Sequence, residues 1–195
     1  MYKHKNGITL RKLSKQDLPI LTDLKNESWF GTHNIAFVND TDQENWFNSI
    51  NWNRSMFLIA VDENTKDSVG LYKIQNIDWL NRKYDSAHDV FSSYRRMGYG
   101  KTVLEAGIDF GFEILNMNRI DTEVLENNQA SLKTAIYAGY SIEGRKRNAI
   151  HKCGEYLDSI VLGILREDWV NLERVKGYQG ICNVSYQPKN DDKIK

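Results

Sequence analysis

One short segment, residues 94–102 (YRRMGYGKT), constrains this chain more than any other part of its sequence. It lies between a predicted strand over 84–92 and a long predicted helix that runs to about residue 116. Two glycines two positions apart let the backbone pass close to a ligand, and the first turn of a helix leaves its amides unpaired. Such a turn binds anions. Because Arg95, Arg96 and Lys101 add positive charge around it, we expect a pyrophosphate group as the ligand.

Two common phosphate-binding motifs do not fit this segment. Gly100-Lys101-Thr102 looks like the end of a P-loop, but the glycine that a P-loop requires five residues before Gly100 is Arg95 here. The dinucleotide-binding pattern GxGxxG fails as well, since its third glycine position is Val103. A third motif remains.

Arg95, Gly98 and Gly100 resemble the Gln/Arg-x-x-Gly-x-Gly/Ala motif of the Gcn5-related N-acetyltransferase (GNAT) superfamily, in which the loop amides hold the pyrophosphate of coenzyme A. Four later motifs occur in the order of the ribosomal-protein and nucleotide-amino-sugar branch: residues 128–131 (NQAS), 139–140 (GY), 143–144 (EG) and 154–158 (GEYLD). The resemblance covers about residues 8–169. It implies acetyl-CoA as co-substrate and no metal.

The hydrophobic periodicity agrees with an α/β fold of the GNAT type, with a mixed central sheet of about seven strands and flanking helices. Alternating or continuously apolar runs predict strands, and apolar stripes at helical spacing predict helices. The predicted strands are 8–13, 56–61, 68–74, 84–92, 119–125, 141–150 and 156–165, and the predicted helices are 16–26, 41–50, 98–116 and 128–138. At least one parallel crossover is expected at the centre of the sheet. We expect one acetyltransferase domain over residues 1–169 and a C-terminal extension, 170–195, with a frayed tail.

The balance of charge argues against two classes of partner. Lysine plus arginine and aspartate plus glutamate number 26 each, so no net positive field gathers a nucleic acid or an anionic membrane. No stretch approaches the length of an apolar membrane span. Cys153 and Cys182 lack the spacing of a metal site. A cytoplasmic protein without a nucleic-acid partner is therefore expected. The extension from residue 170 could cover its own sheet or a second copy in a homodimer.

The resemblance also assigns the residues that hold the co-substrate. In the family the strand before the loop splays from its neighbour, and backbone amides there receive the acetyl oxygen. Here that strand end contains Asp89, Val90 and Phe91. The predicted cofactor-binding residues are Val90, Phe91, Arg95, Arg96, Gly98, Tyr99, Gly100, Lys101 and Asn128.

Acetylation of an amine needs a neutral nitrogen nucleophile, support for the oxyanion and a proton for the departing thiolate. Asp85 lies ten residues before Arg95, where some relatives place a catalytic glutamate, and Asp89 follows on the same strand face. We rank Asp85 first and Asp89 second as base or amine-orienting group. The tyrosine that many relatives use as acid is Ala135 here, so Ser131 or water is the candidate at the thiol end.

The acceptor is expected to be a small molecule with a primary amine, such as a nucleotide-linked amino sugar. Trp29, His33 and His151 are the predicted acceptor-binding residues, because loops and N-terminal helices shape the acceptor pocket in this fold. Protein N-termini, polyamines and aminoglycosides remain alternative acceptors. A binding module that keeps the acyl-CoA fold without turnover is the alternative to an enzyme.

Overall fold

The computed structural model describes residues 1–32 and 37–176. The strands are β1 (Tyr2–Lys3), β2 (Ile8–Lys12), β3 (Met56–Asp62), β4 (Ser68–Asp78), β5 (Lys83–Val90), β6 (Arg119–Leu125), β7 (Ser141–Lys152) and β8 (Glu155–Leu165). The helices are α1 (Leu18–Ser28), α2 (Asp40–Ser49), α3 (Tyr99–Glu113), α4 (Gln129–Ala138) and α5 (Arg166–Val170). The predicted strands and longer helices are all present, with ends shifted by a few residues.

The described strands form one mixed sheet in the order β1-β2-β3-β4-β5-β6-β8-β7. All neighbours are antiparallel except β5 and β6, which are parallel and joined through α3. The predicted crossover at the centre is therefore confirmed, as is the mixed α/β fold. The sheet has eight strands and not seven because Tyr2–Lys3 pairs with Thr9 and Leu10. A two-residue strand has no periodicity that a sequence pattern could reveal.

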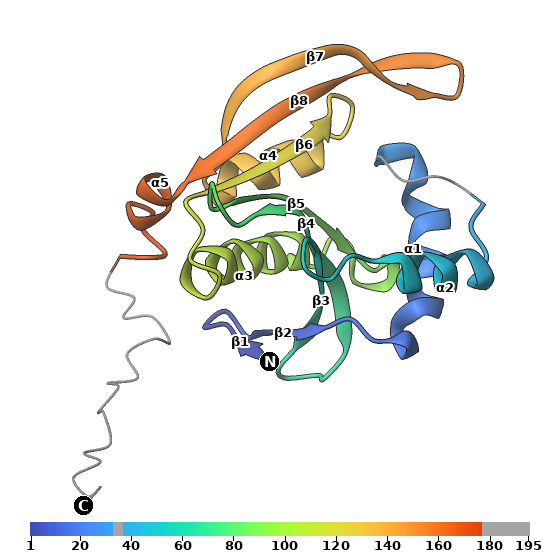
Figure 1. Ribbon diagram of the computed structural model, residues 1–195, viewed down its shortest axis with the longest axis horizontal. Coiled ribbons are helices and arrows are strands. Elements are labelled where there is room, and N and C mark those ends of the chain that lie inside the picture. Colours follow the sequence, from blue (N-terminus) through green and yellow to red (C-terminus); the bar gives the residue numbers. More distant parts are fainter. Residues whose placement is uncertain (33–36, 177–195) are drawn as a thin grey trace, which may run out of the picture.

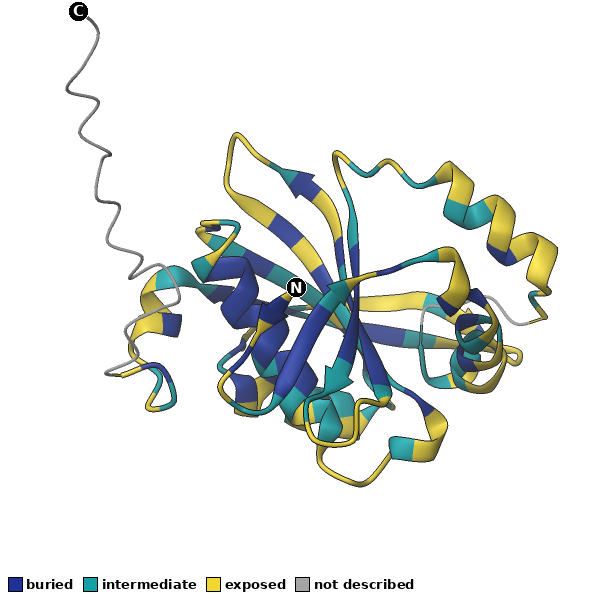
Figure 2. Ribbon diagram, turned by 90° about the horizontal axis from the view of Figure 1, so that it is seen from below, coloured by how far each residue is buried: buried dark blue, intermediate teal, exposed yellow. Residues whose placement is uncertain are grey.

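Helices cover both faces of the sheet (Figure 1). Leu58, Ala60 and Tyr72 face α3 and α4 in the larger apolar cluster. Their neighbours along the strands, such as Ile59 and Leu71, face α1 in the smaller cluster. This alternation follows from the two-residue repeat of a strand. Figure 2 shows the buried residues gathered in the middle of the molecule, where the central strands meet the helices.

Helix α3 packs unusually close to β4 and to β5, the strand that leads into the loop before α3. A Cβ atom at Gly107 would come within 2.2 Å of the Tyr72 ring, and one at Gly111 within 2.2 Å of the Tyr84 hydroxyl. Real Cβ atoms do not approach other atoms so closely. Glycine at these two positions therefore fixes the distance between α3 and the sheet, and with it the position of the loop before α3.

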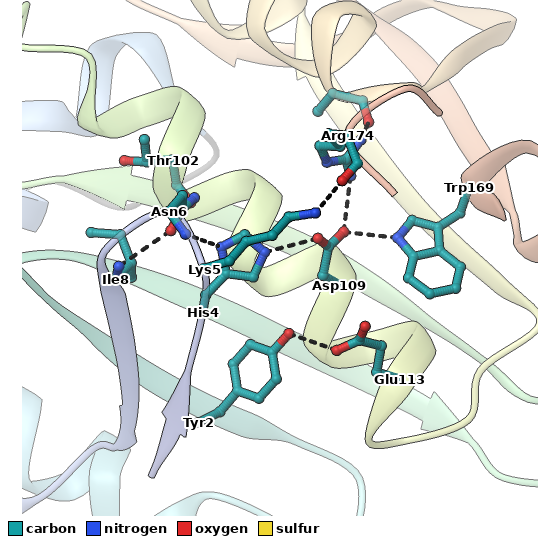
Figure 3. A network of polar contacts seen from close by, with 11 residues as sticks. Tyr2, His4, Lys5, Asn6, Ile8, Thr102, Asp109, Glu113, Trp169 and Arg174 are labelled. Atoms are coloured by element: carbon teal, nitrogen blue, oxygen red, sulfur yellow. Dashed lines mark hydrogen bonds and ion pairs between the residues drawn. The ribbon is translucent and has the colours of Figure 1, made fainter. Parts of the chain in front are cut away.

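A buried carboxylate, Asp109 on α3, joins both ends of the described chain (Figure 3). Its Oδ2 lies 2.8 Å from Nε2 of His4, while Oδ1 accepts hydrogen bonds from Nε1 of Trp169 at 2.8 Å and Nη2 of Arg174 at 3.0 Å. Burial alone would raise the pKa of Asp109, but the bonds from His4 and Trp169 and the charge of Arg174 outweigh it, so the pKa lies below its usual range.

The extension after residue 169 begins against the core. Leu172 packs against the larger cluster and Val175 is buried within it. Helix α5 was not predicted, since five residues carry too little periodicity. Residues 177–195 and His33 lie outside the described residues. Among the described residues, no helix is long and apolar enough to cross a membrane.

Candidate active site

The central parallel strands part soon after they begin. Backbone pairing between β5 and β6 covers only residues 83–85 and 119–121. At the point of divergence the Ser86 hydroxyl donates to the Asp121 carbonyl at 3.2 Å, and the Thr122 hydroxyl donates to the Ser86 carbonyl at 2.9 Å. Beyond this point the two strands no longer pair, which leaves a V-shaped opening in the sheet.

A cavity of about 1190 Å³ fills this opening. Its walls come from β4, β5, β6, the end of α1, the loop before α3 and the first turns of α4. The lining includes predicted site residues from β5, from the loop and first turn of α3, and from the start of α4: Asp85, Asp89, Val90, Arg95, Gly100, Asn128 and Ser131. The structure thus brings together residues that are up to about a quarter of the chain apart in sequence.

The register of β4 and β5 determines which amides face the cavity. Phe91 donates its amide hydrogen to the Val69 carbonyl at 3.0 Å, and its ring is buried beneath α1. Because alternate residues of an antiparallel strand pair with the same neighbour, the amides of His88 and Val90 point away from β4, toward the opening. The prediction therefore needs a correction: the Phe91 amide is already used, whereas the Val90 amide is oriented toward the cavity.

The loop before α3 has the conformation that an anion site needs. Gly98 is the N-cap residue of α3 with φ of 92°, in the left-handed region. Arg96 also has a positive φ, 63°. Among the described residues, the backbone amides of residues 96–100 have no recorded hydrogen-bond partner. A Cβ atom at Gly100 would touch only Val90, at 3.8 Å. Free amides and open space together fit the pyrophosphate of coenzyme A.

The side chains around this loop differ in where they point. Arg95 lines the cavity, donates from Nε to the Val90 carbonyl at 3.3 Å and lies 3.8 Å from the Glu27 carboxylate. Arg96 is exposed. The Tyr99 hydroxyl donates to Asp62 on the far side of the loop, at 2.9 Å. The Lys101 ammonium lies 3.3 Å from the centre of the Tyr137 ring, which links α3 to α4.

The start of α4 forms the opposite wall. The Asn128 side chain caps the helix by accepting from the Ser131 amide at 3.1 Å, and it donates to the Gly31 carbonyl at 2.8 Å. Ser131, the predicted residue for the thiol end, also lines the cavity. Ala135 has no ionisable side chain, and Tyr137, which is 58% exposed, is not among the residues that line the cavity.

The two predicted carboxylates on β5 have different surroundings. Asp89 lies 2.6 Å from the Lys73 ammonium in a nearly buried ion pair. Asp85 is exposed, accepts from the Asn76 amide at 2.8 Å and has no cationic partner among the described residues. Both line the cavity, on the sheet face that α1 covers.

Sequence reasoning missed His88, which lines the same cavity from the face that α3 and α4 cover. Its side chain is partly buried and has no recorded hydrogen bond with a described residue. Burial lowers the pKa of His88, with opposing smaller effects from Asp89 and Lys73, and this favours the neutral imidazole. Its position two residues before Val90 was the signal available in the sequence.

The predicted acceptor residues lie outside the cavity lining or outside the described residues. The Lys152 ammonium donates to the Trp29 carbonyl at 2.7 Å and lies 5.4 Å from the Trp29 ring centre. His151 is exposed in the β7–β8 hairpin, with its ring 5.1 Å from that of Tyr156. Phe30, Gly31 and Thr32 line the cavity in place of Trp29. No group of three or more potential metal ligands occurs within residues 1–32 and 37–176.

The chain is similar in sequence to known N-acetyltransferases. The model of the family described as "Acetyltransferase (GNAT) domain" matches residues 8–141. A prophage-derived uncharacterized N-acetyltransferase of Bacillus subtilis is 24% identical over 163 residues, covering 84% of this chain and 92% of the relative. Spermidine N(1)-acetyltransferase of Vibrio cholerae is 22% identical over 169 residues, covering 84% and 96%.

A solved structure of an N-acetyltransferase has the same fold as this chain. The crystal structure of spermidine N-acetyltransferase from Vibrio cholerae, in complex with CoA and spermine, matches with a TM-score of 0.80. Identity is 22%, and the match covers 86% of this chain and all of that one.

Proposed function

The chain belongs to the acetyltransferase (GNAT) domain family, and on that premise we propose that its acceptor is a polyamine, a small molecule with several amino groups. It is an N-acetyltransferase that uses acetyl-CoA as its co-substrate. The sequence favoured a nucleotide-linked amino sugar as the acceptor. The charge of the cavity favours a polyamine instead, and the likeness to spermidine acetyltransferases supports the same choice.

The acidic lining of the cavity carries this proposal. Five carboxylates line it, from Glu27, Asp85, Asp89, Asp121 and Glu123, against two cations, Lys73 and Arg95. The lining residues therefore carry three more negative than positive charges, five minus two, and Arg119 and Lys146, which lie outside the lining, offset two of these. Such a cavity concentrates cationic molecules and repels anionic ones.

Asp85 is the carboxylate best placed to hold a second ammonium group of the acceptor. Asp121 pairs with Arg119 and Glu123 pairs with Lys146, so their charges are largely neutralised. Asp85 has only an amide partner. A polyamine held there by one ammonium group can present another, deprotonated amino group to the thioester.

The loop before α3 and the opening between β5 and β6 bind different parts of acetyl-CoA. The amides at the start of α3 bind the pyrophosphate, and the pantetheine arm enters between β5 and β6. The Val90 amide, oriented into the opening, donates to the acetyl oxygen and stabilises the oxyanion. Val90 and the loop glycines are the parts of the predicted cofactor set that the geometry favours most.

His88 is our candidate for proton transfer. The neutral amine attacks the thioester carbonyl and forms a C–N bond, which gives a tetrahedral intermediate with a positively charged nitrogen. The neutral His88 imidazole takes the proton from that nitrogen. The imidazolium then gives it to sulfur as the C–S bond breaks, so the products are an amide and coenzyme A. His88 lies on the α4 side, where Ala135 replaces the expected tyrosine.

The role of Asp85 is tested with Asp85→Asn and with two acceptors, spermidine and a monoamine of similar length. We expect the KM for spermidine to rise about tenfold, since one lost charge contact contributes about 1.4 kcal/mol. The KM for the monoamine should stay within about twofold. Glu155→Gln, an exposed carboxylate on the β7–β8 hairpin, is the control. Equal changes for both acceptors would contradict a polyamine site at Asp85.

The role of His88 is tested with His88→Gln and His88→Ala. Loss of the proton carrier should lower kcat about 100-fold with little change in acetyl-CoA affinity. Added imidazole should restore part of the activity of His88→Ala. In the wild type, activity should fall as pH drops through the lowered pKa of His88, and this limb should vanish in His88→Gln. Unchanged kcat and pH profile would move proton transfer to water or Asp85.

A further inference from the structure

A second, smaller cavity lies between α1, α2 and the sheet. Its volume is about 120 Å³, enough for several water molecules or one small ligand group. Leu21, Trp46 and Phe57 contribute apolar walls. Lys25 and Lys73 also line it, and Lys73 lines the large cavity too, so the two cavities are neighbours.

The charged groups of this small cavity do not balance. The Lys25 ammonium donates to the Gln43 side-chain oxygen at 2.7 Å and lies 4.5 Å from the Trp46 ring centre. No carboxylate among the described residues pairs with Lys25. Asp89 is occupied by Lys73 at 2.6 Å. Lys73 therefore has a carboxylate partner, and Lys25 has none among the described residues.

Two further observations indicate that the positive charge of Lys25 is not compensated. Burial, and then the neighbouring charge of Lys73, lower the pKa of Lys25. Gln43 is only 1% exposed, and its side-chain nitrogen has no hydrogen-bond partner among the described residues. A buried donor without a partner is costly, and a half-buried cation without an anion is more so. Lys25 lines the small cavity, and Gln43 is the hydrogen-bond partner of Lys25.

We propose that the small cavity binds an anion, a carboxylate or phosphate group, between Lys25 and Lys73. The anion accepts hydrogen bonds from both ammonium groups, and any attached carbon chain lies against Leu21 and Phe57. A polyamine does not fit this place, because two ammonium groups repel it. The site is therefore separate from the acidic wall at Asp85.

Binding at this site changes the charge beside the acceptor cavity. Lys73 is shared between the anion and Asp89, and Asp89 lines the large cavity. An anion that neutralises the lysines reduces repulsion of a cationic acceptor. Occupancy of the small cavity is thus coupled to the acceptor site through Lys73.

The test is direct binding by isothermal titration calorimetry, with the protein saturated with coenzyme A so that the loop amides are occupied. The probes are inorganic phosphate and acetate in separate titrations, at constant ionic strength maintained with sodium chloride. We expect saturable one-site binding with Kd on the order of 1 mM for at least one probe. Lys25→Met, which removes the ammonium group and keeps an unbranched side chain one atom shorter, should weaken it at least about tenfold. The control Lys15→Met removes an exposed lysine in the short turn before α1 and should stay within about twofold.

Trp46 supplies an independent signal because its ring contacts Lys25. Probe binding should change tryptophan fluorescence in the wild type and not in Trp46→Phe. This measurement also covers the case in which Lys25→Met does not fold. Absence of saturable binding, equal binding by Lys25→Met, or a probe-induced fluorescence change in Trp46→Phe as large as in the wild type would each overturn the proposal. None of these readouts depends on acetyl transfer, so they are separate from the test of the acceptor.

Discussion

Replacing Asp109 by asparagine tests the network in Figure 3. We expect the variant to lose about 3 kcal/mol of unfolding free energy. The carboxylate has two oxygens and accepts from three groups, on His4, Trp169 and Arg174. Asparagine has one side-chain oxygen, and an NH2 group takes the place of the other. This NH2 group must then face a hydrogen-bond donor, either His4 or the pair Trp169 and Arg174.

His4 cannot remove this conflict by changing its tautomer. Its Nδ1 accepts from the Asn6 amide at 3.2 Å, which fixes the hydrogen on Nε2, the atom that faces Asp109. The variant therefore loses at least one buried hydrogen bond, at about 1–3 kcal/mol, and leaves Arg174 without its charge partner, which adds to the loss.

The measurement is urea and thermal unfolding of both proteins. A loss of about 3 kcal/mol corresponds to a fall of roughly 6–12 °C in Tm for a chain of this size. Glu105→Gln, on the same helix and without a recorded side-chain partner, is the control and should change stability by less than about 0.5 kcal/mol. A loss below about 1 kcal/mol in Asp109→Asn would refute the reasoning.

The pH dependence has a defined sign. The pKa of Asp109 is lowered in the folded protein, so the stability it contributes is fully present above the pKa of the unfolded carboxyl group. That stability is lost as pH falls through the lower, folded value. The difference in unfolding free energy between the wild type and Asp109→Asn should therefore become smaller only in acid, below about pH 4.

The remaining predictions concern three glycines. Gly98→Ala should lose about 1–2 kcal/mol of unfolding free energy, because the φ of 92° at this position is strained for alanine. Gly100→Ala lies within α3 and should be equal to the wild type in stability or up to about 1 kcal/mol more stable. Gly100→Ala should nonetheless weaken coenzyme A binding several-fold, about 1 kcal/mol, because its methyl group enters the pyrophosphate path; unchanged affinity in calorimetry would contradict the loop assignment. Gly107→Ala should lose about 1–3 kcal/mol in thermal unfolding, since the new Cβ overlaps the Tyr72 ring, and wild-type stability would contradict the close packing of α3.

Local patterns explain which parts of this fold could be predicted. Glycine spacing located the loop at Gly98, apolar runs and alternation located the strands, and the order strand, helix, strand along the chain predicted the parallel crossover. Asn128, which the family resemblance assigned to cofactor binding, is the N-cap residue of α4, a role that was not predicted from the sequence. These features depend on residues close together in the chain.

The parts that could not be predicted depend on contacts between distant segments. The β4–β5 register decides that Phe91 uses its amide internally while the His88 amide faces the opening. The pairing of His4 with Asp109 spans 105 residues. The direction of the β7–β8 hairpin places His151 among exposed residues and outside the cavity lining. No local pattern carries such information.

The most direct test of the proposed function is a thiol-release assay with acetyl-CoA and the wild-type protein, with mass spectrometry of the product. Spermidine, spermine, an amino sugar and a monoamine are compared at equal concentration. We predict coenzyme A release that depends on the acceptor, a product one acetyl group heavier, and kcat/KM for the polyamines at least about tenfold above that for the monoamine. Faster turnover of the amino sugar, or no preference for polyamines, would contradict the account.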